Sequence, residues 1–199
     1  MVHGFLIHTL RCRPGEEAGH SRVLYSRVFS PEGLEDARCQ ERDKERLCRK
    51  EQLLVVARQV ESACKLHQQA SGKPHSEHLI QLPDEPVSLQ DAPSGVFRLP
   101  PGDPFSEDKT VLWLGVQCLA FALVCDPHEN LMLAESTLRL LAKVLLDRLK
   151  LLSSGSDILL KADRTEAVLH RFLPHGQLLF LNEQFVVALE KEASASLCK

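Results

Sequence analysis

The residues with the clearest potential for chemistry form a cluster of possible metal ligands. Cys64 and His67 are separated by two residues, and His75 and His78 follow with the same spacing. Zinc sites use cysteine and histidine pairs at such short separations. Cys64 and His67 fall on the apolar side of a predicted helix, however, whereas His75 and His78 lie in a proline-rich stretch. We therefore predict no metal at this cluster, and any other role for it is left open.

A second pattern, Ser62 followed by Lys65, has the spacing of a serine-lysine nucleophile pair. Both residues fall on a surface turn of the same predicted helix, and no loop that could form an oxyanion hole accompanies them. The glycine signatures G-x-S-x-G, G-x-x-x-x-G-K-[ST] and G-x-G-x-x-G do not occur. We therefore predict that the chain is not an enzyme and that it uses no cofactor.

The amino-acid composition indicates which classes of function and which compartment fit the chain. The 199 residues are 44% hydrophobic, which is enough for the core of one domain. Lys and Arg number 24 against 27 Asp and Glu, so no net positive field attracts nucleic acid. The seven cysteines include no C-x-x-C pair, a usage typical of reduced cytosol. We predict a cytoplasmic protein that contacts membranes only through a partner.

Short apolar runs predict a sheet with helices on both of its faces. Residues 5–7 and 23–29 are β-prone and suggest an antiparallel hairpin. From 43 to 67 the apolar residues recur with helical period, and 111–114 is again β-prone. The run 118–125 has no polar alternation, so a strand there must be buried on both faces. An α+β fold with helices covering each side of the sheet meets this requirement.

The stretch 71–109 differs from the rest of the chain. It holds seven of the eleven prolines among Ser, Asp, Glu and Gln. We predict an exposed, proline-rich insertion at 71–109 within a single domain that covers 1–199. Only residues 96–99 could pair within it, as an edge strand, because proline cannot donate into a central ladder.

The second half is predicted to be mainly helical. Asp126 provides a side-chain acceptor at the N-cap, with Pro127 at the first helical position, so a helix is expected from there to about Leu152. Further helices are expected at 157–172 and 183–192.

The helix after Asp126 has an apolar stripe that should face the sheet. At about 100° per residue the stripe shares one broad arc, and Glu135 with Arg139 marks the solvent side as an i,i+4 pair. The stripe consists of Leu131, Ala134, Leu138, Leu141, Ala142, Leu145 and Leu149.

A second apolar arc on the same helix is the candidate partner interface. Left uncovered, it would form an exposed apolar ridge. One interpretation is that the following helix, with Ala162, Leu169 and Phe172, packs on the ridge. The other is that the ridge docks a larger protein. The ridge residues are Leu133, Leu140, Val144 and Leu151.

Four segments resemble a known family. They are MVHGFLIHTL at 1–10, RVLYS at 22–26, VARQVES at 56–62 and LPHGQLLFLN at 173–182. They look like the small, or sigma, subunit of the fifth heterotetrameric adaptor-protein complex, and the resemblance runs nearly end to end.

That resemblance implies a longin-like sheet of five antiparallel strands between helices, in a subunit without catalytic activity. It implies assembly with zeta, beta and mu subunits on late endosome or lysosome membranes. It also implies endosome-to-Golgi transport alongside spatacsin and spastizin, independent of clathrin.

The chain departs from typical sigma subunits in the 71–109 stretch and in its longer C-terminal end, so cargo binding and the surface that meets each subunit stay open. The alternative function is a longin-type regulatory module that binds a small GTPase or a SNARE helix. Such a module would be soluble alone and bind reversibly.

Overall fold

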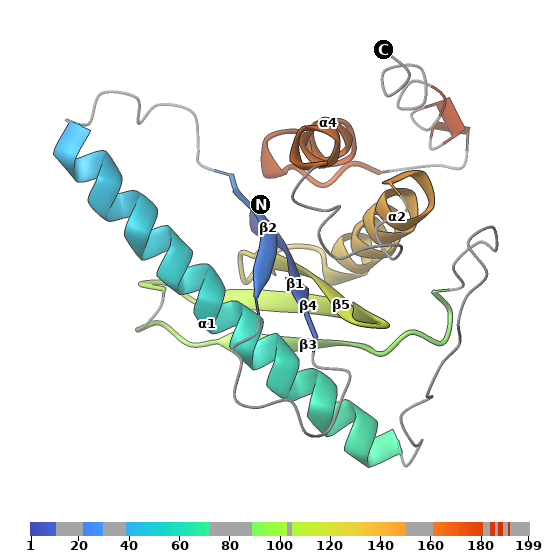
Figure 1. Ribbon diagram of the computed structural model, residues 1–199, viewed down its shortest axis with the longest axis horizontal. Coiled ribbons are helices and arrows are strands. Elements are labelled where there is room, and N and C mark those ends of the chain that lie inside the picture. The colour runs from blue at the N-terminus through green and yellow to red at the C-terminus, as the bar shows by residue number, and fades with distance from the viewer. Residues whose placement is uncertain are drawn as a thin grey trace.

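Among the residues that it describes, the computed structural model places five strands and the helices α1, α2 and α4 in the order that the apolar runs indicate (Figure 1). It describes residues 1–10, 22–29, 39–71, 89–102, 105–149, 161–180, 184–185, 187–188 and 191. The elements are β1 (Val2–Thr9), β2 (Val23–Val28), α1 (Cys39–Ser71), β3 (Ser94–Leu99), β4 (Lys109–Val116), β5 (Leu119–Cys125), α2 (Leu131–Leu149), α4 (Ala162–Phe172) and the short 3-10 turn η1 (Pro174–Gly176).

The strands form one antiparallel sheet in the order β2-β1-β5-β4-β3. The predicted hairpin is present, since Phe5 pairs with Arg27 across β1 and β2. Every residue of β4 and β5 is buried, as the lack of polar alternation in 118–125 predicts. These two strands and β1 therefore lie between two apolar layers, and both layers must be supplied by helices.

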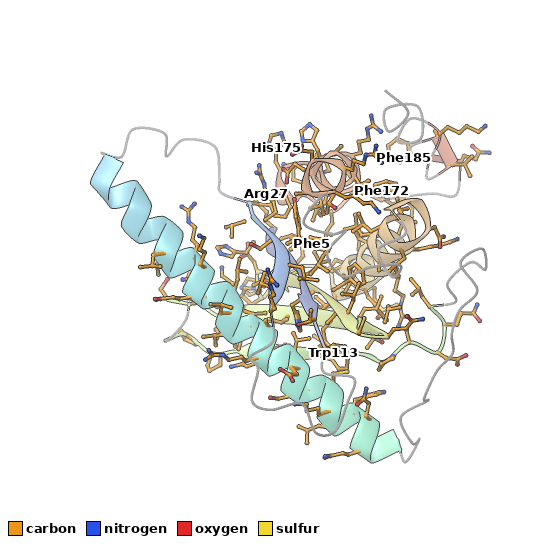
Figure 2. All side chains as sticks on the ribbon, viewed as in Figure 1. Phe5, Arg27, Trp113, Phe172, His175 and Phe185 are labelled. Carbon is orange, nitrogen blue, oxygen red and sulfur yellow. The ribbon has the colours of Figure 1, made fainter. Side chains whose placement is uncertain are left out.

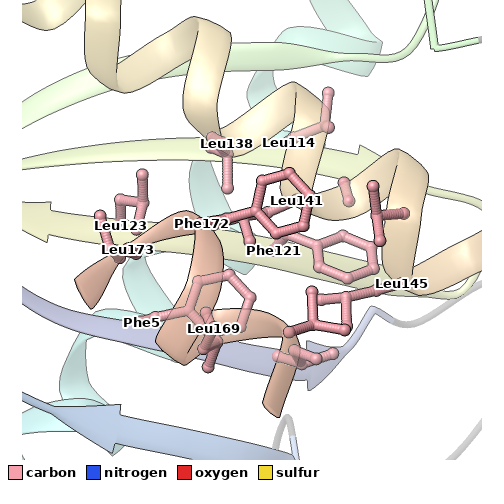
Figure 3. Packing of buried hydrophobic residues seen from close by; sticks show 14 of the residues in the cluster. Phe5, Leu114, Phe121, Leu123, Leu138, Leu141, Leu145, Leu169, Phe172 and Leu173 are labelled. Atoms are coloured by element: carbon pink, nitrogen blue, oxygen red, sulfur yellow. The ribbon is translucent and has the colours of Figure 1, made fainter. Parts of the chain in front are cut away.

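Two separate cores cover the two faces of the sheet. α1 crosses one face, and α2 with α4 covers the other, as Figure 1 shows. On the α2 side, Phe121 of β5 packs with Leu141 of α2 and Phe172 of α4 (Figure 3). On the α1 side, Trp113 of β4 packs with Val56 and neighbouring residues of α1. The expected fold class, α+β with helices on both faces, is confirmed.

α1 confirms its predicted apolar arc but is longer than predicted. The helix runs from Cys39 to Ser71 rather than from 43 to 67. The arc is buried except for Ala63, which is half-buried. Its residues are Leu53, Val56, Ala57, Val60, Ala63 and Cys64.

The predicted start of α2 is wrong. The helix begins at Leu131, and the N-cap is Asn130, whose Oδ1 accepts a hydrogen bond from the backbone N–H of Leu133 at 3.1 Å. Asp126 instead directly follows β5, and its carboxylate accepts a hydrogen bond from Lys109 Nζ at 2.8 Å. The carboxylate of Asp126, which local sequence spacing assigns to the N-cap, is thus used in a tertiary ion pair with Lys109.

Part of the stretch predicted to be an exposed insertion belongs to the fold. The edge-strand prediction for 96–99 is confirmed, because β3 pairs with β4. Leu99 and Phe105 are buried, however, and both join the core on the α1 side. These two positions are therefore core residues, while the exposed insertion at 71–109 within a single domain stays a prediction. Residues 72–88 and 103–104 lie outside the described residues.

The later helices are described in part. α4 covers the end of the predicted 157–172 helix, whereas 150–160 lies outside the described residues. Within the predicted 183–192 helix, the described residues 184–185, 187–188 and 191 are helical. Among the helices in the described ranges, none is long and apolar enough to cross a membrane.

A tight turn after α4 returns the chain to β1. His175 and Gly176 both have positive φ, at 50° and 77°, a region that glycine occupies at low cost. Gly176 also lies so close to β1 and the end of β2 that a Cβ there would collide with the carbonyl oxygen of Val2 and approach Phe29 Cβ at 2.8 Å.

Gly176→Ala should therefore destabilise the protein through the clash, and Gly102→Ala is the matched control. Gly102 also has a positive φ, but a Cβ there would meet nothing within 4 Å. We expect urea denaturation to show a free energy of unfolding lower for Gly176→Ala than for Gly102→Ala by about 1 to 3 kcal/mol. Equal stabilities would contradict the close contact with β1.

Candidate partner-binding surfaces

Of the four possible metal ligands, Cys64 and His67 lie in the described part of the chain. Cys64 lies buried in the α1-side core, and burial raises the pKa of its thiol. His67 of α1 meets Trp113 of β4 edge-on, with ring centroids 6.0 Å apart. His75 and His78 lie outside the described residues. A protonated, buried thiol is a poor metal ligand.

Ser62 and Lys65 do not form a nucleophile pair. The Ser62 hydroxyl donates to the backbone carbonyl of Arg58 at 3.0 Å, within the same helix. Lys65 Nζ instead donates to Glu61 Oε1 at 2.9 Å. The lysine is thus held as a cation by a carboxylate and is not positioned to accept a proton from the serine.

The apolar ridge predicted on α2 is largely covered by the chain itself. Val144 is only 2% exposed and belongs to the core that includes Leu169 and Phe172 of α4, and Leu140 packs against that core. Val144 is therefore not available to a partner and Leu140 is partly covered by that core, while a docking role for the rest of the ridge stays a prediction. Leu133 is half-buried and outside both core clusters. Leu151 lies outside the described residues.

A groove with a volume of about 300 Å³ lies beyond the edge of α2, between that helix and β3. Leu112, Leu114 and Leu138 form its apolar floor. Val96 on β3, which is 55% exposed, and Met132 on α2, which is 78% exposed, line it toward solvent. Two exposed apolar side chains beside an apolar hollow are typical of a surface that another protein covers.

Arg139 fixes the position of β3 relative to α2. Its guanidinium donates to the carbonyl of Leu89 at 2.9 Å and to Ser94 Oγ at 2.8 Å, and it also pairs with Glu135 at 3.0 Å. The sequence assigned Arg139 to a solvent-facing ladder, and the Glu135 pair confirms that part. Spacing along a helix gave no sign that the same arginine clamps a segment 45 residues upstream.

Lys109 forms a second anchor, at the start of β4. Its side chain is 8% exposed, and its ammonium group lies 2.8 Å from Asp126 Oδ1 and 3.3 Å from Glu107 Oε2. Burial alone would raise the pKa of Asp126, but the hydrogen bond and charge of Lys109 outweigh it and hold this pKa below its usual range. This ion pair joins the beginning of β4 to the end of β5, so the positive charge of Lys109 has a structural role.

Other exposed apolar residues lie on two further surfaces. Leu47, Leu54 and Leu66 project from α1, while Phe180 and Phe185 belong to the chain after η1. Phe185 lies away from the sheet in Figure 2. Of the exposed apolar positions in the described residues, Val96 and Met132 are the ones that border the groove.

The five-stranded antiparallel sheet and the helical layers on its two faces define a longin-like α+β domain. A structure titled "Homology model of the full-length AP-3 complex in a stretched open conformation" contains a chain with a similar fold, at a TM-score of 0.50 and 16% identity, over 100% of this chain and 96% of that one. At this identity the similarity supports the fold alone.

Sequence comparison gives the family. The profile of the family described as AP-5 complex subunit sigma-1 matches residues 1–194. AP-5 complex subunit sigma-1 of Homo sapiens is 59% identical over 98% of both chains. The Mus musculus protein of that name is 58% identical over 77% of this chain and 91% of its own. The chain therefore belongs to the family of AP-5 complex sigma-1 subunits, which are non-enzymatic components of an adaptor complex.

Replacing Arg139 with lysine should loosen β3, because lysine cannot donate to Leu89 and Ser94 with the same planar geometry. We expect Arg139→Lys to lower the free energy of unfolding by about 1 to 2 kcal/mol and to speed amide exchange over 89–94. Lys143→Ala, an exposed change one turn along the helix, should stay within about 0.5 kcal/mol of the unmodified protein. Identical exchange in the two variants would show that Arg139 does not hold β3.

Proposed function

We propose that the chain stabilises its adaptor complex by packing against a large subunit, and that the complex moves cargo from late endosomes to the Golgi. Membership of the AP-5 sigma-1 family supports a place in an assembly of large and medium subunits. The observation that carries the packing role is the uncovered apolar surface at Val96 and Met132, which border one groove.

The side-chain chemistry of the described residues supports the same conclusion. Lys109, Arg139 and Lys65 are each neutralised by a carboxylate. The buried thiol of Cys125, like that of Cys64, is kept protonated, because burial raises the pKa of Cys125 to about 12. These five groups are thus paired or protonated, whereas apolar surface is left over at Val96 and Met132.

The remaining partners follow from the family resemblance. We propose the zeta and beta large subunits and the mu medium subunit as companions, with spatacsin and spastizin as further contacts of the assembled complex. The chain would then be peripheral on late endosome or lysosome membranes and would reach them through these proteins. Leu133 on α2 stays a candidate contact for the large subunit, because it is half-buried and outside both cores.

Co-expression with the zeta-type large subunit tests the packing role. We expect a higher yield of soluble chain and co-elution of the two proteins as one complex in size-exclusion chromatography, because association covers the exposed apolar residues. The proposal would be contradicted if the chain were monodisperse alone and did not bind the large subunit, but bound a small GTPase or a SNARE helix reversibly.

The transport pathway is tested separately in cells that lack the chain. The large subunit should lose abundance and its late endosomal position, and cargo should fail to return to the Golgi. Re-expression of the unmodified chain should restore all three. If cargo returned normally to the Golgi in cells without the chain, the proposed transport pathway would be wrong, whereas the proposed packing role would be unaffected.

A further inference from the structure

The outer edge of β3 carries backbone groups that point away from the sheet. β3 pairs with β4, and the backbone N–H of Gly115 donates to the carbonyl of Pro93 at 2.8 Å. Antiparallel pairing alternates between inward and outward groups. Counting from Pro93, the N–H and C=O groups of Ser94, Val96 and Arg98 therefore face away from β4. Among the described strands, none pairs with β3 on that side.

The side chains of the same three residues lie on the α2 face of the sheet. Ser94 is opposite Leu114 and Val96 is opposite Leu112, and both leucines belong to the core on the α2 side. α2 does not extend over Val96, which is why this valine borders the groove and stays 55% exposed. A strand added outside β3 would thus place every second side chain beside the groove.

Arg98 adds a charge to this edge. It is exposed and follows Val96 by two residues, so the two side chains share a face. Within the described residues Arg98 makes no ion pair, in contrast to Arg139 and Lys109, which are neutralised. An added strand that bears a carboxylate at the matching position would supply the missing charge.

We propose that β3 binds a short extended segment of the large subunit by strand addition. The segment contributes an apolar side chain to the groove beside Val96 and an acidic side chain next to Arg98, two positions apart on one face. Pro93 and Pro100 bound the strand, so the segment is short, about the length of β3 itself. The proposal rests on the proposed function, because it names the surface through which that subunit is held.

Amide hydrogen exchange on the free chain and on the purified complex with the zeta-type subunit tests this proposal without any mutation. We expect the amides of Val96 and Arg98 to exchange at least about tenfold more slowly in the complex, because each gains a hydrogen-bond acceptor. The amide of Phe97, which faces β4, should change little. Unchanged exchange at Val96 and Arg98 in an intact complex overturns the strand addition and leaves the proposed function standing.

The same measurement identifies other occupants of the edge. If Val96 and Arg98 are already protected in the free chain at every concentration, residues of the same chain cover the edge and the proposal fails. Protection that grows with the concentration of the free chain shows pairing between two copies, and this outcome also overturns it. Failure of the two proteins to associate at all contradicts the proposed function instead.

Two pairs of variants separate the backbone contribution from the side-chain contribution. Val96→Pro removes only an outward N–H, which an edge strand tolerates, while Val96→Ala keeps it. Arg98→Glu reverses the charge, while Arg98→Lys keeps it. We expect the proline and glutamate variants to weaken association with the large subunit at least about tenfold relative to their controls. Equal binding of the two variants within both pairs overturns the proposal. If Val96→Pro unfolds the chain, the amide exchange rates of Val96 and Arg98 in the unmodified complex decide whether a strand is added.

Discussion

The constraint on which the structure depends is that its central strands are apolar on both faces. β4 and β5 are buried along their whole length, so neither face of the sheet can meet water. α1 supplies one apolar layer, and α2 with α4 supplies the other. This arrangement fixes the order of the layers, and it also decides which part of the sheet stays uncovered. The helices on the α2 side end over β4 and leave the outer flank of β3 open.

Several charged side chains at the borders of these layers join elements of the fold. Cations at the sheet ends are used to hold elements together, as Lys109 does between β4 and β5 and Arg139 between α2 and β3. The polar contact between the Tyr25 hydroxyl and Glu166, with Arg27 3.3 Å from the same carboxylate, likewise joins β2 to α4. Each of these interactions joins elements that lie apart in the sequence.

The sequence predicts what depends on local pattern and fails where distant segments compete. The uninterrupted apolar run of β5 predicts a doubly covered sheet, and the arc around Val56 and Val60 predicts the buried face of α1. The N-cap at Asp126 was wrong because Lys109, 17 residues upstream, takes its carboxylate, and Asn130 then caps α2. Periodicity identified the ridge at Val144 and left two interpretations of it, and the structure then shows Val144 buried in the core on the α2 side.

The groove was beyond sequence reasoning for a similar reason. Its walls come from β3 and α2, which are more than 30 residues apart, and only the edge strand at 96–99 was visible as a short β-prone run. Nothing in the spacing of Val96 and Met132 shows that they border one hollow. The resemblance to sigma subunits gave the fold and the family, whereas the groove beside β3 became visible only from the arrangement of the layers.

A structure of the assembled complex by electron cryomicroscopy tests the central claim most directly, because it shows what lies against the flank that the helices leave open. The account predicts an extended segment of the large subunit alongside β3, with an apolar side chain in the groove. A complex in which the large subunit sits elsewhere and the outer edge of β3 faces solvent would contradict it.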